Sequence, residues 1–364
     1  MPVRILSIDG GGIRGIIPAT ILVALEDMAG RSIFELFDGI VGTSTGGILA
    51  LGLTCPQVNG RPRSAVSVRS LYLDRGETIF PLSDVGFFSP PKTYRDALWG
   101  TRAPLAPGAT AGERAKSALG WGNIARVFSG TGGGKKQGNA RYPVGPLEAE
   151  LDQQFGDARM SQALRPVAVV SCDLARSEHL LFCGGGLPQG DLGDPSMRVV
   201  ARATSAAPTF FREQPLRDLQ GRDRQCVDGG LVANDPSIVG YMVAEMLGAT
   251  NQGGVVLISL GTGKAPVPEG EDIAQITINA PWWKLASPVV KSIWGTPGDL
   301  HRQLLTNLSH VNYIRVQPPL GFGALAAMDR ATRDNIDALK RTGEDFVSKR
   351  RDTLIGILAA LGSR

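Results

Sequence analysis

Residues 3–15 read Val-Arg-Ile-Leu-Ser-Ile-Asp-Gly-Gly-Gly-Ile-Arg-Gly, and this stretch contains the pattern that decides the fold. Val3 to Ile8 is a short apolar run of strand-forming residues that ends at an acid followed by three glycines. Ile16 to Met28 then carries apolar residues at helical spacing. The stretch therefore predicts a strand, a glycine turn and a helix.

The same order returns further along the chain. Phe37 to Val41 is a second strand candidate, followed by Gly-Thr-Ser-Thr-Gly-Gly at 42–47 and by an apolar helix candidate, Ile48 to Leu53. The same criteria predict two more strands and two more helical stretches, at Val167 to Ser171, Val255 to Ser259, Pro236 to Leu247 and Asp329 to Leu361. Strands that alternate with helices predict an α/β fold in which helices cover both faces of a mostly parallel sheet.

The length of 364 residues suits two domains or one large α/β domain. We expect a single domain over residues 1–364. Residues 86–141 are rich in proline and glycine and lack apolar periodicity, so they are predicted to be an insertion or lid. The C-terminal part, 266–364, is expected to be variable and helical.

The inserted segment is cationic. From 92 to 141 it has nine Lys or Arg residues against two acids. This balance suits an anionic lipid surface, a phosphate ligand or simply a solvated loop. A second irregular stretch, 281–305, holds Trp282, Trp283 and Trp294, which suit packing on the protein body or contact with a lipid interface.

The composition argues against several classes of protein. Hydrophobic residues make up 43% and charged residues 20%, a globular balance that argues against wholesale disorder. The net charge of +4 is too small to predict binding to a nucleic acid polymer. The four cysteines are widely spaced, so no metal site is expected. Without a signal peptide or a long apolar run, the sequence predicts a cytoplasmic protein with only peripheral membrane contact, and it specifies no oligomeric state.

Residues 42–46 fit the pattern G-x-S-x-G between a predicted strand and a predicted helix. In that context the motif forms a sharp turn that projects a nucleophilic serine, here Ser44. Gly42 and Gly46 are expected because so tight a turn leaves no room for side chains on either side of the serine. The alternative is an ordinary glycine-rich turn between a strand and a helix.

The glycine turn at 9–15 can point successive backbone N–H groups into one concavity, which makes an anion-binding nest. Beside Ser44 it would be an oxyanion hole, with Arg14 orienting the loop or adding positive potential. The same residues also fit G-x-G-x-x-G, a dinucleotide-binding pattern. Asp9 would repel a pyrophosphate, and the acids about 20 positions on, Glu35 and Asp38, precede the second strand instead of ending it. These features favour the oxyanion hole.

A serine nucleophile needs a base within hydrogen-bond reach. The chain has three histidines, of which His301 and His310 follow the serine in the order usual for hydrolases with this turn. Asp228 is the other candidate, because Asp228-Gly229-Gly230 follows a short apolar pair and suits a carboxylate at a strand end. An ordinary Asp-Gly turn is the alternative for Asp228.

Four blocks together carry a resemblance to a known family. They are DGGGIRG at 9–15, GTSTGG at 42–47, ATSAAPTFF at 203–211 and DGG at 228–230. Shorter matches are Pro-Leu-Glu at 146–148 and Ser-Leu-Gly-Thr-Gly at 259–263. Over roughly residues 3–265 the chain resembles the patatin-like phospholipases.

The resemblance implies a patatin-like three-layer α/β/α fold and a Ser-Asp dyad that requires no histidine, calcium or other cofactor. Ser44 would be the nucleophile and Asp228 its base, and the backbone N–H groups of Gly10, Gly11 and Gly12 would hold the oxyanion. The implied substrates are acyl lipids, chiefly glycerophospholipids, and the implied partner is a phospholipid membrane surface.

Compact bacterial members with this opening also resemble phospholipase effectors of antiviral (antiphage) defence that a cyclic nucleotide switches on. The basic segment 92–141 is one place to look for the corresponding phosphate-binding surface. Three rival hypotheses stay open: a histidine-dependent serine esterase, a dinucleotide-binding oxidoreductase, and a non-catalytic lipid or nucleotide sensor.

Overall fold

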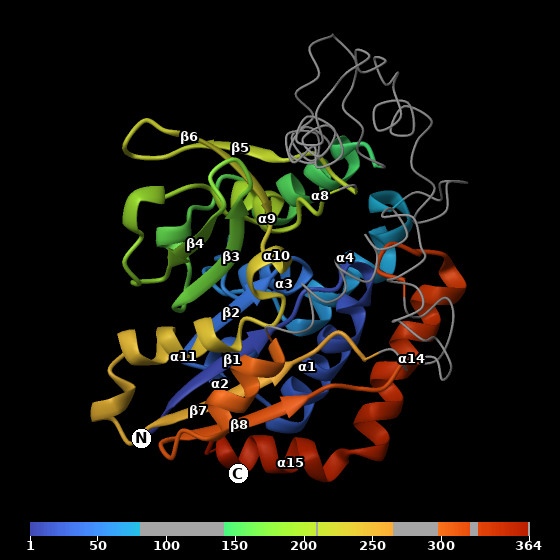
Figure 1. The fold of residues 1–364 in the computed structure, drawn as a ribbon. Helices are drawn as coiled ribbons and strands as arrows, with labels where there is room; N and C mark the ends of the chain where they lie inside the picture. The colour runs from blue at the N-terminus through green and yellow to red at the C-terminus, as the bar shows by residue number, and fades with distance from the viewer. Residues whose placement is uncertain (81–141, 209, 265–297, 321–326, 363–364) are drawn as a thin grey trace, which may run out of the picture.

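The computed structural model describes residues 1–80, 142–208, 210–264, 298–320 and 327–362, and within them one eight-stranded sheet forms the centre of the molecule (Figure 1). The strand order is β5-β6-β3-β2-β1-β7-β8, with β4 also paired to β3. The strands are β1 (Val3–Ile8), β2 (Gly39–Thr43), β3 (Val167–Asp173), β4 (Glu178–Gly184), β5 (Gln214–Arg217), β6 (Asp223–Asp228), β7 (Val255–Leu260) and β8 (Val311–Val316).

The sheet is parallel through its middle and antiparallel at one side. The pairs β3–β2, β2–β1, β1–β7 and β7–β8 are parallel, whereas β3–β4, β3–β6 and β6–β5 are antiparallel. The prediction of a mostly parallel sheet is therefore confirmed.

β3 shares one of its edges between two strands. β4 pairs with β3 along its whole length, Val167 to Asp173, and so occupies one edge. A strand has only two edges, so β2 and β6 must both lie on the other. β2 pairs with residues 167–170 of β3 and β6 with residues 171–173.

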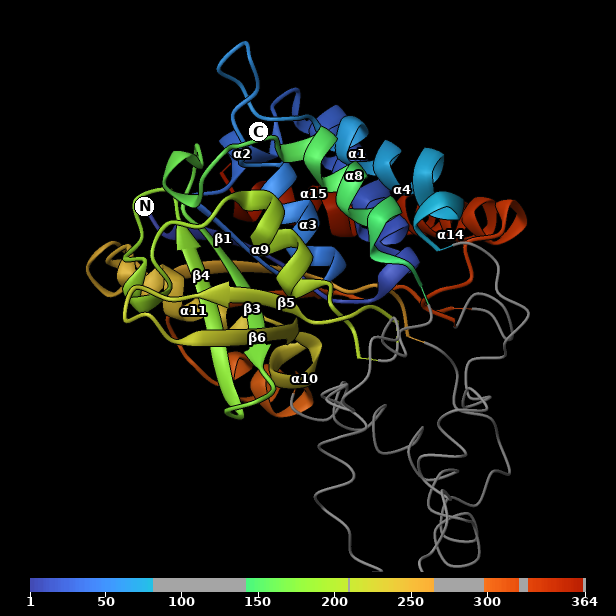
Figure 2. The same cartoon turned by 90° about the horizontal axis from the view of Figure 1, so that it is seen from above.

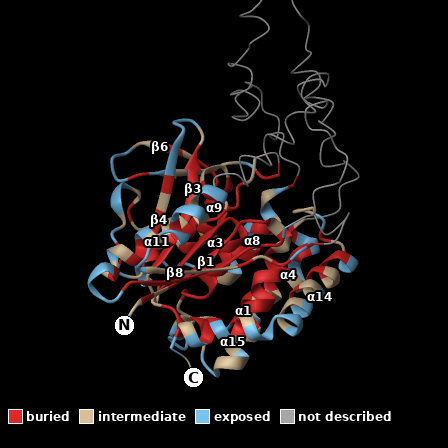
Figure 3. Ribbon diagram, turned by 60° about the horizontal axis from the view of Figure 1, so that its bottom comes forward, coloured by how far each residue is buried: buried red, intermediate tan, exposed pale blue. Residues whose placement is uncertain are grey.

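Helices cover both faces of the sheet, as the α/β prediction requires (Figure 2). Successive residues of a strand point to opposite faces. In β1, Leu6 and Ile8 pack in the larger core, whereas Val3 and Ile5 pack in a second core with Val243 of α11. The larger core joins α1, α3, α4, α8, α9, α14 and α15. Buried residues gather in the central strands and exposed ones on the outer faces of helices such as α14 (Figure 3).

The helices that matter for these layers are α1 (Ile16–Ala29), α2 (Ile33–Leu36), α3 (Thr45–Gly52), α4 (Ala65–Ile79), α8 (Val144–Phe155), α9 (Met197–Thr204), α10 (Gly230–Ala233), α11 (Ser237–Met246), α14 (Arg333–Lys349) and α15 (Arg351–Ala360). The glycine turn itself forms a short 3₁₀ helix, Gly12–Gly15. Among the described residues, none of the helices combines the length and the apolar character that crossing a membrane requires.

Several predicted boundaries are corrected by the structure. The helix predicted at Ile48 to Leu53 begins at Thr45, directly after the serine, and ends at Gly52. Local propensity did not indicate this start, because threonine and glycine are weak helix formers. The helical stretch predicted at 329–361 is two helices separated at Arg350. Residues 281–305 were predicted to be irregular, but the part of them that the structure describes, 298–305, is helical. The insertion at 86–141 and the three tryptophans of 281–305 lie outside the described residues.

Candidate active site

Ser44 lies in the sharp turn between β2 and α3. Its backbone has φ 54° and ψ −123°, a strained conformation that non-glycine residues rarely adopt outside functional turns. A Cβ on Gly46 would lie 2.1 Å from the carbonyl oxygen of Ile8, and one on Gly42 would lie 2.2 Å from the carbonyl oxygen of Gly46. Only glycine fits at either position. The tight turn at Ser44 can form because a glycine stands two residues before the serine and another two residues after it.

The hydroxyl of Ser44 donates a hydrogen bond to Oδ2 of Asp228 at 2.6 Å. The other carboxylate oxygen of Asp228 accepts from the backbone N–H of Gly230 at 2.7 Å. Both side chains are buried, with 9% of Ser44 and 4% of Asp228 exposed. Burial raises the pKa of Asp228 to about 6, although the hydrogen bonds from Ser44 and Gly230 oppose the rise. A carboxylate with this pKa is a better proton acceptor than an exposed aspartate and is still ionised at neutral pH.

Thr204, at the end of α9, fixes the backbone of the serine. Its hydroxyl accepts a hydrogen bond from the N–H of Ser44 at 2.8 Å and donates to the carbonyl oxygen of Val170 at 2.5 Å. The side chain thus ties the strained turn to β3. Thr204 belongs to the block ATSAAPTFF, but no role was predicted for it because the block shows no local pattern that points to this contact.

The glycine loop lies beside the serine. A Cβ built on Gly10 would lie 3.3 Å from Cβ of Ser44. The N–H groups of Gly11 and Gly12 have no hydrogen-bond acceptor among the described residues, and both glycines line the same cleft as Ser44 and Asp228. Two adjacent unpaired amides at this place can donate to a negatively charged oxygen.

Gly10 corrects the expectation of a third backbone donor. Its N–H donates to the carbonyl oxygen of Asn234 at 3.0 Å and so is already bonded. Arg14 lies behind the loop, with its backbone N–H 3.2 Å and its Nε 3.5 Å from the carbonyl oxygen of Gly11. Burial lowers the pKa of Arg14 to about 10, and the nearby Asp9 opposes this change. These contacts support the loop-orienting alternative for Arg14.

The cleft that opens over Ser44 has a volume of about 740 Å³, its open mouth included. Its walls come from α4, α8 and the segment around Phe210, and most of the side chains are aliphatic or aromatic: Ile48, Leu71, Ile79, Phe80, Leu147, Leu151, Phe210 and Phe211. An apolar cleft with a few polar groups at one end is typical of a site that binds a largely apolar ligand.

The C-terminal part also contributes to this cleft. Met328 and Asp329 line it, and the carbonyl oxygen of Met328 accepts the N–H of Ile13 at 2.9 Å. The hydroxyl of Tyr142 donates to the carboxylate of Asp329 at 2.9 Å. Nothing in the sequence indicated that residues so far along the chain would meet the glycine loop.

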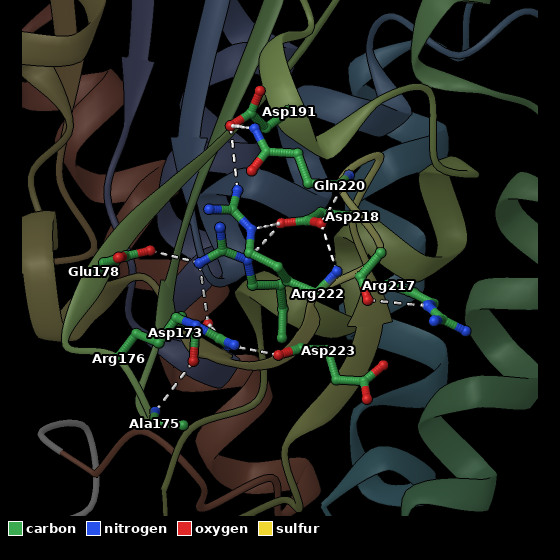
Figure 4. A network of polar contacts seen from close by, with 12 residues as sticks. Asp173, Ala175, Arg176, Glu178, Asp191, Arg217, Asp218, Gln220, Arg222 and Asp223 are labelled. Atoms are coloured by element: carbon green, nitrogen blue, oxygen red, sulfur yellow. Dashed lines mark hydrogen bonds and ion pairs between the residues drawn. The ribbon is translucent and has the colours of Figure 1, made fainter.

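Ion pairs fasten the strand that ends in Asp228. Arg224 of β6 is buried and binds Asp218 at 3.0 Å, Asp173 at 3.3 Å and Glu178 at 2.5 Å. The contacts join the β5–β6 hairpin to the β3–β4 hairpin (Figure 4). Burial acts to raise the pKa of Asp218, but hydrogen bonds from Arg222 and Arg224 outweigh it and hold this pKa well below its usual value. The network therefore fixes β6 against β3.

The three histidines lie outside the set of described residues that line the cleft over Ser44. His310 directly precedes β8, at the amino end of the parallel strands, and its ring lies 3.1 Å from the hydroxyl of Tyr241. His179 is exposed on β4, and His301 lies in the helical segment 298–306.

The acids considered for dinucleotide binding are engaged elsewhere. Asp38 binds Arg4 through both carboxylate oxygens, and Glu35 accepts hydrogen bonds from Ser32 at the start of α2. Neither Glu35 nor Asp38 is therefore free to bind the ribose of a dinucleotide. Asp9 forms an ion pair with Arg315, which balances its negative charge. The expectation that Asp9 would repel a pyrophosphate is therefore wrong.

Three comparisons relate the chain to known proteins. The family model described as "Patatin-like phospholipase" matches residues 6–238. Patatin-like protein 2 of Arabidopsis thaliana is 29% identical over 381 residues, covering 95% of this chain and 83% of its own length. Patatin group D-3 of Solanum tuberosum is 28% identical and covers 95% and 84%. VipD from Legionella pneumophila is a solved structure that matches with a TM-score of 0.37 and 16% identity, over 94% of this chain and 67% of its own.

Proposed function

The chain belongs to the patatin-like phospholipase family, and on this premise we propose that it cleaves fatty acyl esters of phospholipids through a Ser44–Asp228 dyad. The observation that carries the proposal is the 2.6 Å hydrogen bond between the two side chains at the end of an apolar cleft. The apolar walls suit an acyl chain, and the polar end suits its ester carbonyl.

In the first half-reaction Asp228 accepts the proton of Ser44 while Oγ attacks the ester carbonyl carbon. The carbonyl oxygen becomes an oxyanion and accepts hydrogen bonds from the N–H groups of Gly11 and Gly12. Each such donor contributes roughly 3 kcal/mol of transition-state stabilisation. When the intermediate collapses, the bond to the leaving oxygen breaks, the acyl group stays on Ser44, and Asp228 returns the proton to the leaving lysolipid.

In the second half-reaction water replaces the lysolipid. Asp228 accepts a proton from the water, whose oxygen attacks the acyl carbon, and the same two amides hold the second oxyanion. Collapse then breaks the acyl–Ser44 bond, the proton returns to Oγ, and a fatty acid leaves. The buried position of Asp228 supports this role, because burial raises its pKa to about 6 and so strengthens it as a base.

A fluorophosphonate probe tests the proposal directly, because it reacts covalently with an activated serine. We expect peptide mass spectrometry to find the label on Ser44, and we expect Ser44→Ala to lose the label and all hydrolysis of phospholipid vesicles. Asp228→Asn should slow both reactions by at least about 10⁴-fold, since the two residues act as a unit.

Ser205 supplies the matched control. It also lines the cleft, but its hydroxyl donates to the carbonyl oxygen of Ala201 in α9, the helix that ends directly before it. Ser205→Ala should keep wild-type labelling and hydrolysis. Label on any residue other than Ser44, or unchanged rates in both dyad variants, would refute the dyad. The non-catalytic sensor instead predicts that Ser44→Ala leaves the cellular function of the protein unchanged.

Activation by a cyclic nucleotide and a role in antiviral defence rest on the resemblance alone. The segment 92–141, where a phosphate-binding surface was expected, lies outside the described residues. Membrane contact through this segment and through the tryptophans of 281–305 is likewise a prediction. Adding cyclic nucleotides to the labelling reaction tests the activation hypothesis, which requires a faster reaction of Ser44 when the activator is present.

A further inference from the structure

Arg315 of β8 reaches across the sheet end to the residue that begins the glycine loop. Its two terminal nitrogens bind the two carboxylate oxygens of Asp9, at 2.8 Å and 2.5 Å. One of these nitrogens also lies 3.5 Å from the carboxylate of Asp235 and donates to the hydroxyl of Ser259 at 2.6 Å. The side chain is mostly buried, with 15% exposed.

The two carboxylates flank the hydrogen bond that holds the loop. Gly10, directly after Asp9, donates its N–H to the carbonyl oxygen of Asn234, directly before Asp235. Arg315 therefore joins the residues on either side of this bond. One end of the bond is the loop that presents Gly11 and Gly12, and the other is the segment that follows Asp228. An arginine can bridge two such groups because its guanidinium is planar and holds several donors in a fixed arrangement.

The charges in this cluster make Arg315 hard to replace. Burial acts to lower the pKa of Arg315, but attraction to Asp9 and Asp235 outweighs burial and raises it, so the side chain stays charged. Burial raises the pKa of Asp9 to about 7, and Arg315 is the main charge that opposes the rise, with a smaller contribution from Arg302. Without Arg315, Asp9 would lose its ion-pair partner, whereas Asp235 would keep Arg302, which binds it at 2.9 Å.

We propose that Arg315 is a positioning residue for the reaction, which holds the amides of Gly11 and Gly12 in place beside Ser44 through its contacts with Asp9 and Asp235. The proposal rests on the proposed function, because the amides matter only if an oxyanion forms there. Oxyanion donors act through their placement at the developing charge, so a shift of the loop weakens binding of the transition state more than binding of the substrate. Arg315 lies beyond the residues that the family model matches, 6–238.

The test is Arg315→Met, a substitution that keeps most of the side-chain length and removes the charge and the donors. We expect kcat for a soluble ester, expressed per titrated Ser44, to fall by about 10- to 100-fold while KM changes by less than about threefold. The kcat of Arg315→Lys should lie between those of the wild type and Arg315→Met, because an ammonium group cannot bind both oxygens of Asp9 in the same way. If Arg315→Met does not fold, the lysine variant carries the test, with an expected loss of at least about fivefold in kcat.

Arg4 gives a matched control on the first strand. It binds both carboxylate oxygens of Asp38, at 3.0 Å and 2.6 Å, at the opposite end of β1 from the loop. Arg4→Met removes the same kind of ion pair, and we expect its kcat to stay within about twofold of wild type, as for a surface contact. Equal losses in Arg4→Met and Arg315→Met would overturn the proposal.

Two further outcomes would also overturn it. One is a folded Arg315→Met with kcat within threefold of wild type, and the other is a rise in KM at constant kcat. If the wild type hydrolyses no lipid ester, the proposed function fails, and the rate of fluorophosphonate labelling at Ser44 then tests Arg315 separately. The phosphoryl oxygen of the probe takes the oxyanion position, so labelling should slow by at least about tenfold in Arg315→Met. An unchanged labelling rate would refute the role of Arg315.

Discussion

Thr43 and Asp228 end their strands against adjacent residues of β3, since Thr43 pairs with Val170 and Asp228 pairs with Ser171. β2 runs parallel to β3 and β6 runs antiparallel, so the two strands approach each other along one edge and stop end to end. Ser44 follows Thr43 directly and therefore meets the carboxylate of Asp228 across 184 residues of sequence. A slip of one residue in either pairing would turn Asp228 or the serine turn to the other face of the sheet.

The proposed role of buried Asp228 as the base predicts how the reaction depends on pH. Its pKa is raised to about 6, so the basic form is present above this pH and lost below it. We expect kcat/KM to be level near pH 7 and to fall about tenfold per pH unit below pH 6. The rate of fluorophosphonate labelling against pH measures this. A profile that stays level down to pH 4.5 would contradict the assignment.

Replacing the histidines separates this explanation from a histidine base, whose ordinary pKa of about 6.5 would give a similar profile. His301→Ala and His310→Ala should each keep turnover within about twofold of wild type, because neither ring lines the cleft. The apparent pKa near 6 should persist in both variants. Loss of turnover in a folded histidine variant would favour the rival esterase.

Asp228 is expected to reduce the stability of the folded protein at neutral pH. Its pKa rises from 3.8 to about 6 on folding, so the folded state holds its proton more tightly than the unfolded state. Stability from this group is present at low pH and is lost as the pH rises from about 4 to about 6. Asp228→Asn should therefore raise the free energy of unfolding at pH 7 by up to about 3 kcal/mol. Denaturant unfolding at pH 7 and at pH 4.5 checks this, and an equal gain at both would contradict it.

Gly46 and Gly145 form a matched pair of helical glycines. A Cβ on Gly46 would meet the carbonyl oxygen of Ile8 at 2.1 Å, whereas one on Gly145, in α8, would meet nothing within 4 Å. Gly46→Ala should slow labelling of Ser44 by about 100-fold, because the serine turn must shift. Gly145→Ala should keep the rate and raise stability by up to about 1 kcal/mol. Similar rates in the two variants would show that the turn tolerates a side chain.

Thr204→Val tests how the strained serine turn is held. The variant leaves the N–H of Ser44 and the carbonyl oxygen of Val170 without their partner. We expect a loss of about 1–3 kcal/mol in the free energy of unfolding, together with slower labelling. Thr204→Ser keeps the hydroxyl and should restore most of the labelling rate. If valine and serine behave alike, the hydrogen bonds are not what holds the turn.

Part of this architecture follows from local sequence patterns. β1 has the bounds predicted from its apolar run, Val3 to Ile8, because a short buried strand bounded by glycines is readable without its neighbours. The serine turn is similarly local, since Gly42, Ser44 and Gly46 lie within five residues. β8 was not predicted, although it supplies Arg315, because its mixed polar and apolar residues give no clear period.

The sequence by itself thus determined the alternation of strands and helices, the serine turn and the glycine loop, since each depends on interactions between residues close in the chain. Only the tertiary structure decided that the N–H of Gly10 is used by Asn234, that Thr204 holds Ser44, and that Arg315 reaches Asp9. These contacts join segments up to 306 residues apart. They depend on which strands pair and in what register, and strand pairing is set by the burial of whole faces of the sheet.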